Sequence, residues 1–351
     1  MKKYFSISLF LIFTLCYGYD GTNSNTMPQK ILLNQGHALK GQVIPGYNQS
    51  AMIEVNAWDF LIGASFIYWQ AIEDGLDLGH IYPLVQNENN IGHNIKMNFQ
   101  YKPGFKVSLG MSLYHDNWLL FAEYTWLYLT DIKNVHTSIS NNIAESWNYD
   151  SLNYDIYASW NFRYNMVDLV MLRPCYIGTH LIAKPFTGFR GGWMNQHYTA
   201  ATLTTDIIYA QNKENTWLIG PCAGVNCDWL FFDAFRIIGN SSIALIYQHF
   251  NTNATNVISL TEESQQFTPN LQGAIGLGWG TYLGNNNCWH FDMSALYELT
   301  YFFNQNKMMS LNQKITQSNL VEEISGYAYS PHYANANLML HGLTFSLRFD
   351  F

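Results

Sequence analysis

The chain has 351 residues, a formal net charge of −8, 12% charged residues and 16% aromatic residues. This acidic balance argues against a nucleic-acid-binding protein, because phosphate backbones reward clustered lysine and arginine. Beyond the N-terminus no segment offers about 18 consecutive apolar residues, which excludes membrane-spanning helices. Many aromatics, few charges and no long apolar block are typical of a membrane β-barrel, in which lipid-facing and interior residues alternate.

The N-terminus predicts a secretory signal peptide over residues 1–18. Lys2 and Lys3 precede an apolar run over 4–15, and small residues follow, with cleavage expected after Gly18. Removal of the two lysines would change the net charge from −8 to about −10. An uncleaved membrane helix is a weaker alternative because the run is shorter than about 20 residues. A lipoprotein acylated at Cys16 is weaker still, because the three residues before this cysteine are not small.

The C-terminal segment shows the clearest strand pattern of the chain. Apolar residues occupy alternate positions and polar residues the positions between them, as expected for a strand with one face in lipid. The apolar set is Leu343, Phe345, Leu347, Phe349 and Phe351. We expect this strand to be the signal that the barrel-assembly machinery binds.

Similar alternation occurs at ten places and predicts an all-β fold over residues 55–351. The expected architecture is a transmembrane antiparallel up-and-down barrel of about ten strands, or twelve or more if residues 19–54 or 305–335 contribute. Segment 19–54 is otherwise expected to be an N-terminal periplasmic arm or plug. Short turns near 115–117, 178–180, 231–233 and 284–288 alternate with long links near 73–92, 131–152, 200–213, 253–266 and 305–335. Outer-membrane barrels have this asymmetry, with short periplasmic turns and long extracellular loops.

Two of the expected strands are irregular. Over 154–171 the lipid-facing set begins as Tyr154, Ile156, Ala158, Trp160 and Phe162, slips near Asn165, and continues as Val167, Leu169 and Met171. A β-bulge is the preferred explanation of the slip, and an extra tight hairpin is the alternative. In the strand around 236–248, two isoleucines fall on the expected inner face.

Charged residues on the expected inner faces are the candidate functional residues. Such charges need water or a partner of opposite sign inside a membrane protein. They either line an aqueous pore or pair across a narrow lumen and fill it. The candidates for lining a pore are Lys106, Glu123, Asp155, Arg163, Lys184, Arg190, Arg236, Asp292 and Glu298.

These residues do not decide how wide the lumen of the expected barrel is. The near balance of positive and negative side chains argues against strong ion selectivity. Ten strands lie closer to the eight-stranded barrels that side chains fill than to the wide porins. Inward-facing glycines at 276, 278 and 280 indicate either room in the lumen or a packed N-terminal arm.

Four cysteines follow the predicted leader, and export would permit disulfides between them. They are Cys175, Cys222, Cys227 and Cys288. Cys222 and Cys227 fall on opposite faces of one expected strand, so they cannot pair with each other. The alternative is that the cysteines are simply small apolar residues. Their spacing matches no zinc site, and no metal is expected.

Linear motifs give no support for an enzyme. GxSxG and HExxH are absent, and the eleven histidines show no metal-ligand spacing. We therefore predict no enzyme, no catalytic residues and no cofactor. The minor alternative is a serine, a histidine and an acid that meet at the lumen mouth only in the folded barrel.

Several stretches resemble the Legionella-type major outer membrane protein family, which includes the MOMP-like proteins of chlamydia-related bacteria. The stretches are 66–71 with 73–76, 101–107, 124–127, 184–186 with 188–191, 302–306 and 342–351, in matching order and spacing. The resemblance implies an abundant, pore-forming surface protein and, as in the chlamydial relatives, disulfide-linked envelope proteins. It carries over no catalytic residues. The four cysteines do not match a family framework, which puts the crosslinking in doubt.

We therefore expect a protein of the outer membrane that lets small solutes or ions diffuse through its lumen. The alternative is a structural or adhesive surface barrel with a closed lumen. Expected partners are outer-membrane lipid, the barrel-assembly machinery and further copies of the chain or disulfide-linked envelope proteins, but not nucleic acid.

Overall fold

A computed structural model describes the chain over residues 49–50, 60–83, 93–113, 118–136, 141–147, 155–203, 207–232, 234–256, 258–283, 289–316 and 326–351. The predicted signal peptide over 1–18 and nearly all of segment 19–54 lie outside these residues, so the proposed domain boundaries stay predictions. Within the described ranges, no helix has the length and apolar character to cross a membrane.

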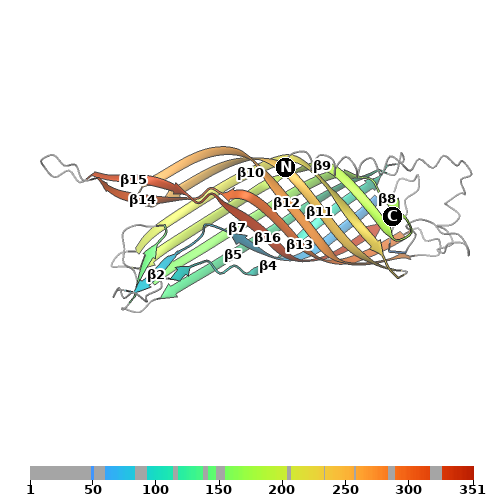
Figure 1. Ribbon diagram of the computed structural model, residues 1–351, viewed down its shortest axis with the longest axis horizontal. Coiled ribbons are helices and arrows are strands. Elements are labelled where there is room, and N and C mark those ends of the chain that lie inside the picture. Colours follow the sequence, from blue (N-terminus) through green and yellow to red (C-terminus); the bar gives the residue numbers. More distant parts are fainter. Residues whose placement is uncertain are drawn as a thin grey trace, which may run out of the picture.

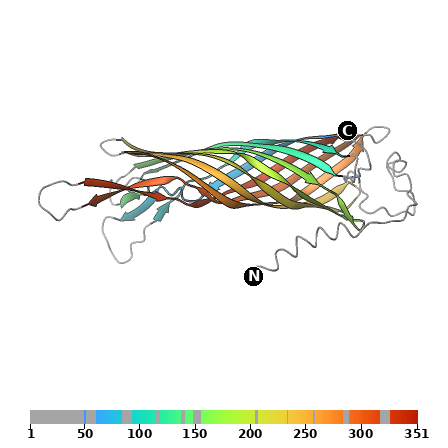
Figure 2. The same cartoon turned by 90° about the horizontal axis from the view of Figure 1, so that it is seen from above.

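Ten antiparallel strands form a closed barrel, as the alternation predicts (Figures 1 and 2). They are β1 (Phe60–Glu73), β4 (Tyr101–Ser112), β5 (Leu119–His136), β7 (Asp155–Leu172), β9 (Leu181–Leu203), β10 (Ile207–Leu230), β11 (Phe235–Thr255), β12 (Ser259–Leu283), β13 (Trp289–Asn306) and β16 (Ala336–Asp350). Each strand pairs with two neighbours, and the pairing of β1 with β16 joins the first and last strands of the barrel. No sheet edge is left in the barrel wall, as a membrane requires.

Short strands extend the barrel at both ends. A three-stranded sheet of β2 (Gly79–Pro83), β3 (His93–Ile95) and β6 (Asn141–Glu145) lies at the end opposite the C-terminus, as does the hairpin of β14 (Met309–Thr316) and β15 (Gly326–Tyr333) (Figure 1). β8 (Cys175–Ile177) pairs with β9 near the C-terminal end. All four links between barrel strands at the C-terminal end are short, whereas the longest links lie at the other end, which identifies the C-terminal end as periplasmic.

The strands are much longer than a bilayer requires. β10 has 24 residues and β12 has 25, whereas about 9–11 tilted residues span the membrane. The long links expected near 200–213 and 253–266 are therefore wrong: β9 continues to Leu203, and β10 resumes at Ile207. β11 likewise continues to Thr255, and β12 resumes at Ser259. The barrel wall itself projects beyond the membrane on the extracellular side.

Strand β7 does not contain the expected bulge. Its register with β5 and β9 is continuous, and even-numbered residues face inward along its whole length. Trp160 and Phe162 are therefore inside, where they are completely buried, and the prediction that they face lipid is wrong. On the outer face, Val167 and Leu169 are apolar, whereas Asn161 is polar. The apparent slip at Asn165 marks the membrane surface, above which the outer face meets water and the inner face carries an apolar core.

Other strands show the same inversion. Their lipid-facing side chains are exposed and apolar in the membrane half, and include Phe189, Trp193, Trp217, Ile219, Ile243 and Leu245. Toward the extracellular end the outer positions become polar, with Asn195, His197 and Thr199 on β9, Lys213 and Asn215 on β10, and His249, Asn251 and Asn253 on β11. The two unexpected isoleucines of β11, Ile238 and Ile246, do face inward and are buried.

A charge placed on the outer face of β7 should therefore have an effect that depends on height. We expect Leu169→Arg to destabilise the folded barrel by about 2–4 kcal/mol, because Leu169 faces the hydrocarbon. Asn161→Arg, on the same face of the same strand, should change stability by less than about 0.5 kcal/mol. Urea unfolding in lipid vesicles, followed by tryptophan fluorescence, measures both. Equal costs at the two positions would refute the placement of the membrane surface near Asn165.

Candidate functional site: the barrel interior

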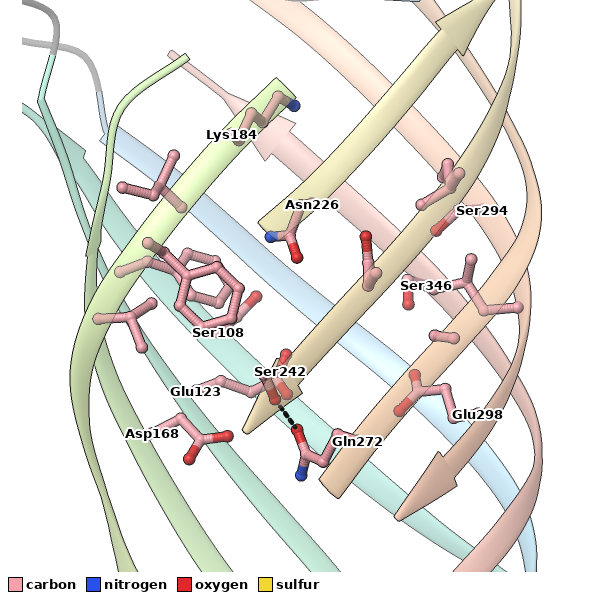
Figure 3. Close-up of a pocket in the computed structure, with 18 of the residues that line it drawn as sticks. Ser108, Glu123, Asp168, Lys184, Asn226, Ser242, Gln272, Ser294, Glu298 and Ser346 are labelled. Carbon is pink, nitrogen blue, oxygen red and sulfur yellow. Dashed lines mark hydrogen bonds between the residues drawn. The ribbon is translucent and has the colours of Figure 1, made fainter. Parts of the chain in front are cut away.

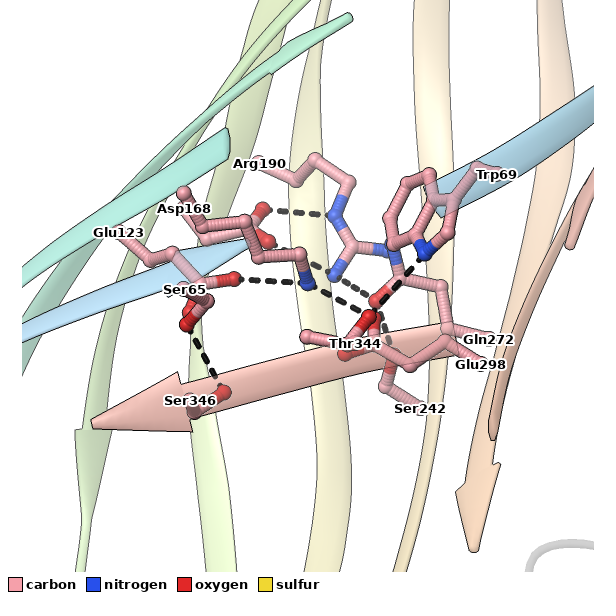
Figure 4. A network of polar contacts seen from close by, with 11 residues as sticks. Ser65, Trp69, Glu123, Asp168, Arg190, Ser242, Gln272, Glu298, Thr344 and Ser346 are labelled. Atoms are coloured by element: carbon pink, nitrogen blue, oxygen red, sulfur yellow. Dashed lines mark hydrogen bonds and ion pairs between the residues drawn. The ribbon is translucent and has the colours of Figure 1, made fainter. Parts of the chain in front are cut away.

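A layer of charged side chains crosses the lumen in the membrane half. We call it the upper charged layer, consisting of Lys106 together with Glu123, Asp168, Arg190 and Glu298, the last four of which are labelled in Figure 4. Lys106 Nζ lies 3.2 Å from Glu123 Oε1 and 2.7 Å from Glu298 Oε2. Because β4 and β13 are separated by two strands, the second contact bridges part of the lumen rather than neighbouring strands. Lys106 thus holds two carboxylates from different sides of the barrel.

Arg190 makes the second bridge of this layer. Its Nε donates to Asp168 Oδ1 at 2.7 Å, and its Nη1 and Nη2 donate to Asn270 and Gln272 at 2.6 and 2.5 Å. Asp168 is on the neighbouring strand, but the two amides come from β12, with two strands between. The guanidinium is 3% exposed, so its donors depend on these partners rather than on water.

A lower charged layer lies nearer the periplasm. Lys184 Nζ lies 2.6 Å from Asp228 Oδ2, and Arg236 Nη1 lies 2.5 Å from Asp292 Oδ2. The remaining members are Arg348, Asp350 and His290, with 3.0 Å from Arg348 Nε to Asp350 Oδ1 and 2.9 Å from His290 Nδ1 to Asp350 Oδ2. Cations and carboxylates are balanced in both layers to within one charge.

Residues 49 and 50, the described part of the N-terminal segment, lie in the lumen at the lower charged layer. Arg236 Nη1 donates to the carbonyl oxygen of Ser50 at 2.5 Å, and His290 Nε2 lies 2.9 Å from that of Gln49. A side chain at Gly280 would come within 3.1 Å of the Ser50 backbone. Of the two explanations for the inward glycines, the structure favours a packed N-terminal segment at this position.

A chamber of about 320 Å³ lies between the two charged layers (Figure 3). One wall, from β1, β5, β7 and β9, carries the apolar side chains Leu61, Leu119, Phe121, Val170, Leu172 and Phe186. The other, from β10, β11, β13 and β16, carries the polar side chains Asn226, Asn240, Ser242, Ser294 and Ser346. Ser50 lines the periplasmic end. Apolar side chains thus predominate on one side of the chamber and polar ones on the other, although Ile238 and Leu296 lie on the strands of the polar side, and Ser65 and Ser108 lie next to the apolar side.

An apolar core fills the lumen above the upper charged layer. Tyr164 of β7 and Phe302 of β13 meet with ring centroids 6.2 Å apart. These strands lie opposite one another in the barrel, with four strands between them on either side. Trp160 and Phe162 stack next to Tyr164, and all are buried. Side chains from opposite walls thus meet inside the lumen at this height.

Seven of the nine charges predicted to face the interior do so, namely Lys106, Glu123, Lys184, Arg190, Arg236, Asp292 and Glu298. The interior placement of Asp155 and Arg163 is wrong. Both lie on the outer face of β7 above the membrane, where Asp155 pairs with His136 and Arg163 lies over the ring of Tyr128. The supposed slip in β7 caused both errors.

The same slip concealed Asp168 as an interior residue. It alternates with Val167 and Leu169, which were correctly assigned to the lipid side, so the local period of two was the signal that could have identified it. The serines of the polar wall carry no such signal, because small polar residues are also common at surfaces.

No disulfide joins Cys175, Cys222 and Cys227 to one another. Cys222 is buried inside, and Cys227 lies on the opposite face, as their parity predicts. Cys175 and Cys227 flank Ala183 from the strands on its two sides, so about two strand spacings, or 9–10 Å, separate them. That distance is too long for a disulfide without backbone movement. Cys288 lies outside the described residues, so its pairing stays open.

The sequence of this barrel matches a known family. The model of the family described as the Legionella pneumophila major outer membrane protein precursor matches residues 53–351. The chain belongs to this family. The resemblance found in the sequence is thereby confirmed, and the protein is an outer-membrane β-barrel. None of the curated proteins compared with this family member matches it.

Solved structures similar to this family member are other bacterial barrels. Outer membrane protease OmpT from Escherichia coli is 9% identical with a TM-score of 0.42, over 84% of this chain and 96% of that chain. The Ralstonia pickettii toluene transporter TbuX is 9% identical with a TM-score of 0.28, over 84% and 88%. A Pseudomonas aeruginosa FadL homologue is 7% identical with a TM-score of 0.24, over 89% and 95%. At such values no activity is carried over.

The prediction that the chain is not an enzyme requires correction. It rested on missing linear motifs, and a protease is among the barrels to which this family member is similar. Missing linear motifs do not by themselves exclude catalysis, because catalytic groups can be brought together only by the fold. Among the described residues, no cluster of three or more histidine, cysteine, aspartate or glutamate side chains could hold a metal ion.

Proposed function

We propose that this family member is a structural or adhesive surface barrel with a closed lumen. This role is the alternative that the sequence analysis gives to a diffusion pore. The contact between Tyr164 and Phe302 carries the proposal, because it joins opposite walls of the lumen within a buried apolar core. Ions cross an apolar constriction poorly, since dewetting alone closes such a path. The charged layers below it then act as polar packing that holds opposite sides of the barrel together.

The extracellular part of the wall supplies the working surface in this proposal. Strands β9 to β12 project beyond the membrane with polar outer faces, and the β14–β15 hairpin extends still further (Figure 2). A rigid projecting wall suits contact with material outside the cell, because strands hold side chains in place better than long loops do. The interior of this projection is buried, with apolar side chains such as Phe250 beside polar ones such as Glu214 and Gln248, and its packing stabilises the projection.

Conductance of the purified barrel in a planar lipid bilayer tests the proposal. We expect no steady current, because the apolar core interrupts the water path. Insertion is verified separately by protection of the membrane half from added protease. A sustained current from inserted wild-type protein would overturn the closed lumen.

A pore remains the second candidate, supported by the chamber and its charged layers. A continuous water path would need the aromatic core to open, since a chamber of about 320 Å³ already lies below that core. This candidate expects current steps in the wild-type protein, with weak ion preference because the interior charges balance. We retain with either candidate the proposal that the assembly machinery binds the C-terminal strand.

A further inference from the structure

We infer that the chamber between the two charged layers is a binding site for a small, uncharged, amphipathic organic molecule. The inference concerns the interior of the barrel and is independent of the proposed surface role. Its basis is the combination of the chamber volume, a lining of apolar and hydrogen-bonding side chains, and paired charges.

The size of the chamber sets the size of the ligand. At about 320 Å³ it lies at the lower end of the range for small-molecule sites. Such a volume would hold roughly ten water molecules, which corresponds to an organic molecule of about 10–15 non-hydrogen atoms. It is too small for a lipid and too large for a single ion.

The two walls define the chemistry of the ligand. Leu61, Leu119 and Leu172 form an apolar cluster with Phe121 and Phe186 packed against it, so this wall suits a ring or a branched alkyl group. Water molecules next to such a wall make few hydrogen bonds, so their replacement by an apolar group of the ligand is favourable.

The opposite wall offers hydrogen bonds. The buried Oδ1 of Asn240 has no hydrogen-bond partner among the described residues, and Ser294 and Ser346 lie on the same side of the chamber (Figure 3). Buried acceptors of this kind are normally satisfied. A hydroxyl or amide on the ligand would donate to Asn240 while its apolar part packs on the leucine wall.

The charged layers argue for a neutral ligand. Lys106, Arg190 and Arg236 each already contact carboxylates, so no cation or anion is left to attract an ionic molecule strongly.

Equilibrium dialysis with 1-naphthol tests the inference. The full-length barrel is placed in lipid nanodiscs, and uptake by empty nanodiscs is subtracted. We expect saturable binding of one 1-naphthol per barrel. Uptake no greater than that of empty nanodiscs would overturn the inference, as would uptake that does not saturate.

Neighbouring residues provide matched variants. Ser242→Phe and Ser294→Phe place a ring in the chamber, whereas Ile243→Phe and Ala295→Phe place it on the lipid-facing side of the same strands. The inner variants should weaken binding about tenfold or more, and the outer variants by less than about twofold. Heat-dependent migration in SDS gels verifies that each barrel is folded. Two inner variants guard against one failing to fold. Equal binding by folded inner and outer variants would refute the site, whatever the conductance result.

Discussion

Lys106→Met is expected to destabilise the folded barrel by about 3 kcal/mol, at the lower end of the cost of removing one partner of a buried ion pair. The ammonium group neutralises Glu123 and Glu298, which are 3.2 and 2.7 Å away. Without it, two carboxylates face each other in the membrane half of the lumen with no cation between them. Urea unfolding of the barrel in lipid vesicles measures the change.

Two further variants separate charge from packing in this experiment. Lys106→Met combined with Glu123→Gln and Glu298→Gln should recover most of the lost stability, because no unpaired charge remains. Lys102→Met serves as the control. Lys102 lies four residues away on the same face of β4, where it makes an exposed hydrogen bond to Gln100, and its loss should cost less than about 0.5 kcal/mol. Equal costs for the two single lysine variants would contradict the bridging role of Lys106.

Phe302→Ala is expected to lower stability by about 3–5 kcal/mol, the usual range for truncating a buried phenylalanine. Phe302 is 0% exposed and meets Tyr164 across the lumen. Its removal leaves a cavity in the apolar core, at the point where side chains from opposite walls of the lumen meet. The same urea unfolding measurement in lipid vesicles applies.

Phe303→Ala is the matched control, because Phe303 lies next in the chain on the outer face and packs only partly, against Tyr301. We expect this variant to cost about 1 kcal/mol, as for a partly exposed side chain. If the outer variant cost as much as the inner one, the apolar core would not be the stabilising element of the extracellular half. Conductance of Phe302→Ala then tests whether the weakened core lets current pass.

Much of the barrel was predictable because lipid imposes a strict rule on each membrane-spanning strand. Alternation in 343–351 and in nine other segments identified the fold, the number of strands and the periplasmic end. The same rule placed Lys106, Arg190 and Glu298 inside. Each of these inferences needs only the period of two within one segment and a known solvent on the outer side.

The rule failed where the outer solvent changed. Within the membrane the outer face of a strand meets lipid and is apolar. Above the membrane the outer face meets water, and the inner face of the same strand is the apolar one. Apolar residues therefore no longer identify the lipid face along the whole strand. Trp160 and Arg163 were misplaced for this reason, although their strand has no irregularity. Only the continuous register with both neighbouring strands revealed how far the wall extends.

The sequence by itself therefore determined that this chain forms a ten-stranded outer-membrane barrel with a charged interior, because those properties are local and repeat along the strand. The tertiary structure alone decided which side chains meet across the lumen and which charges pair. Tyr164 reaches Phe302, and Lys106 reaches Glu298, across a lumen whose width depends on the closure of all ten strands. Contacts between distant strands depend on that diameter and on side-chain volume, and no pattern within one segment contains either quantity.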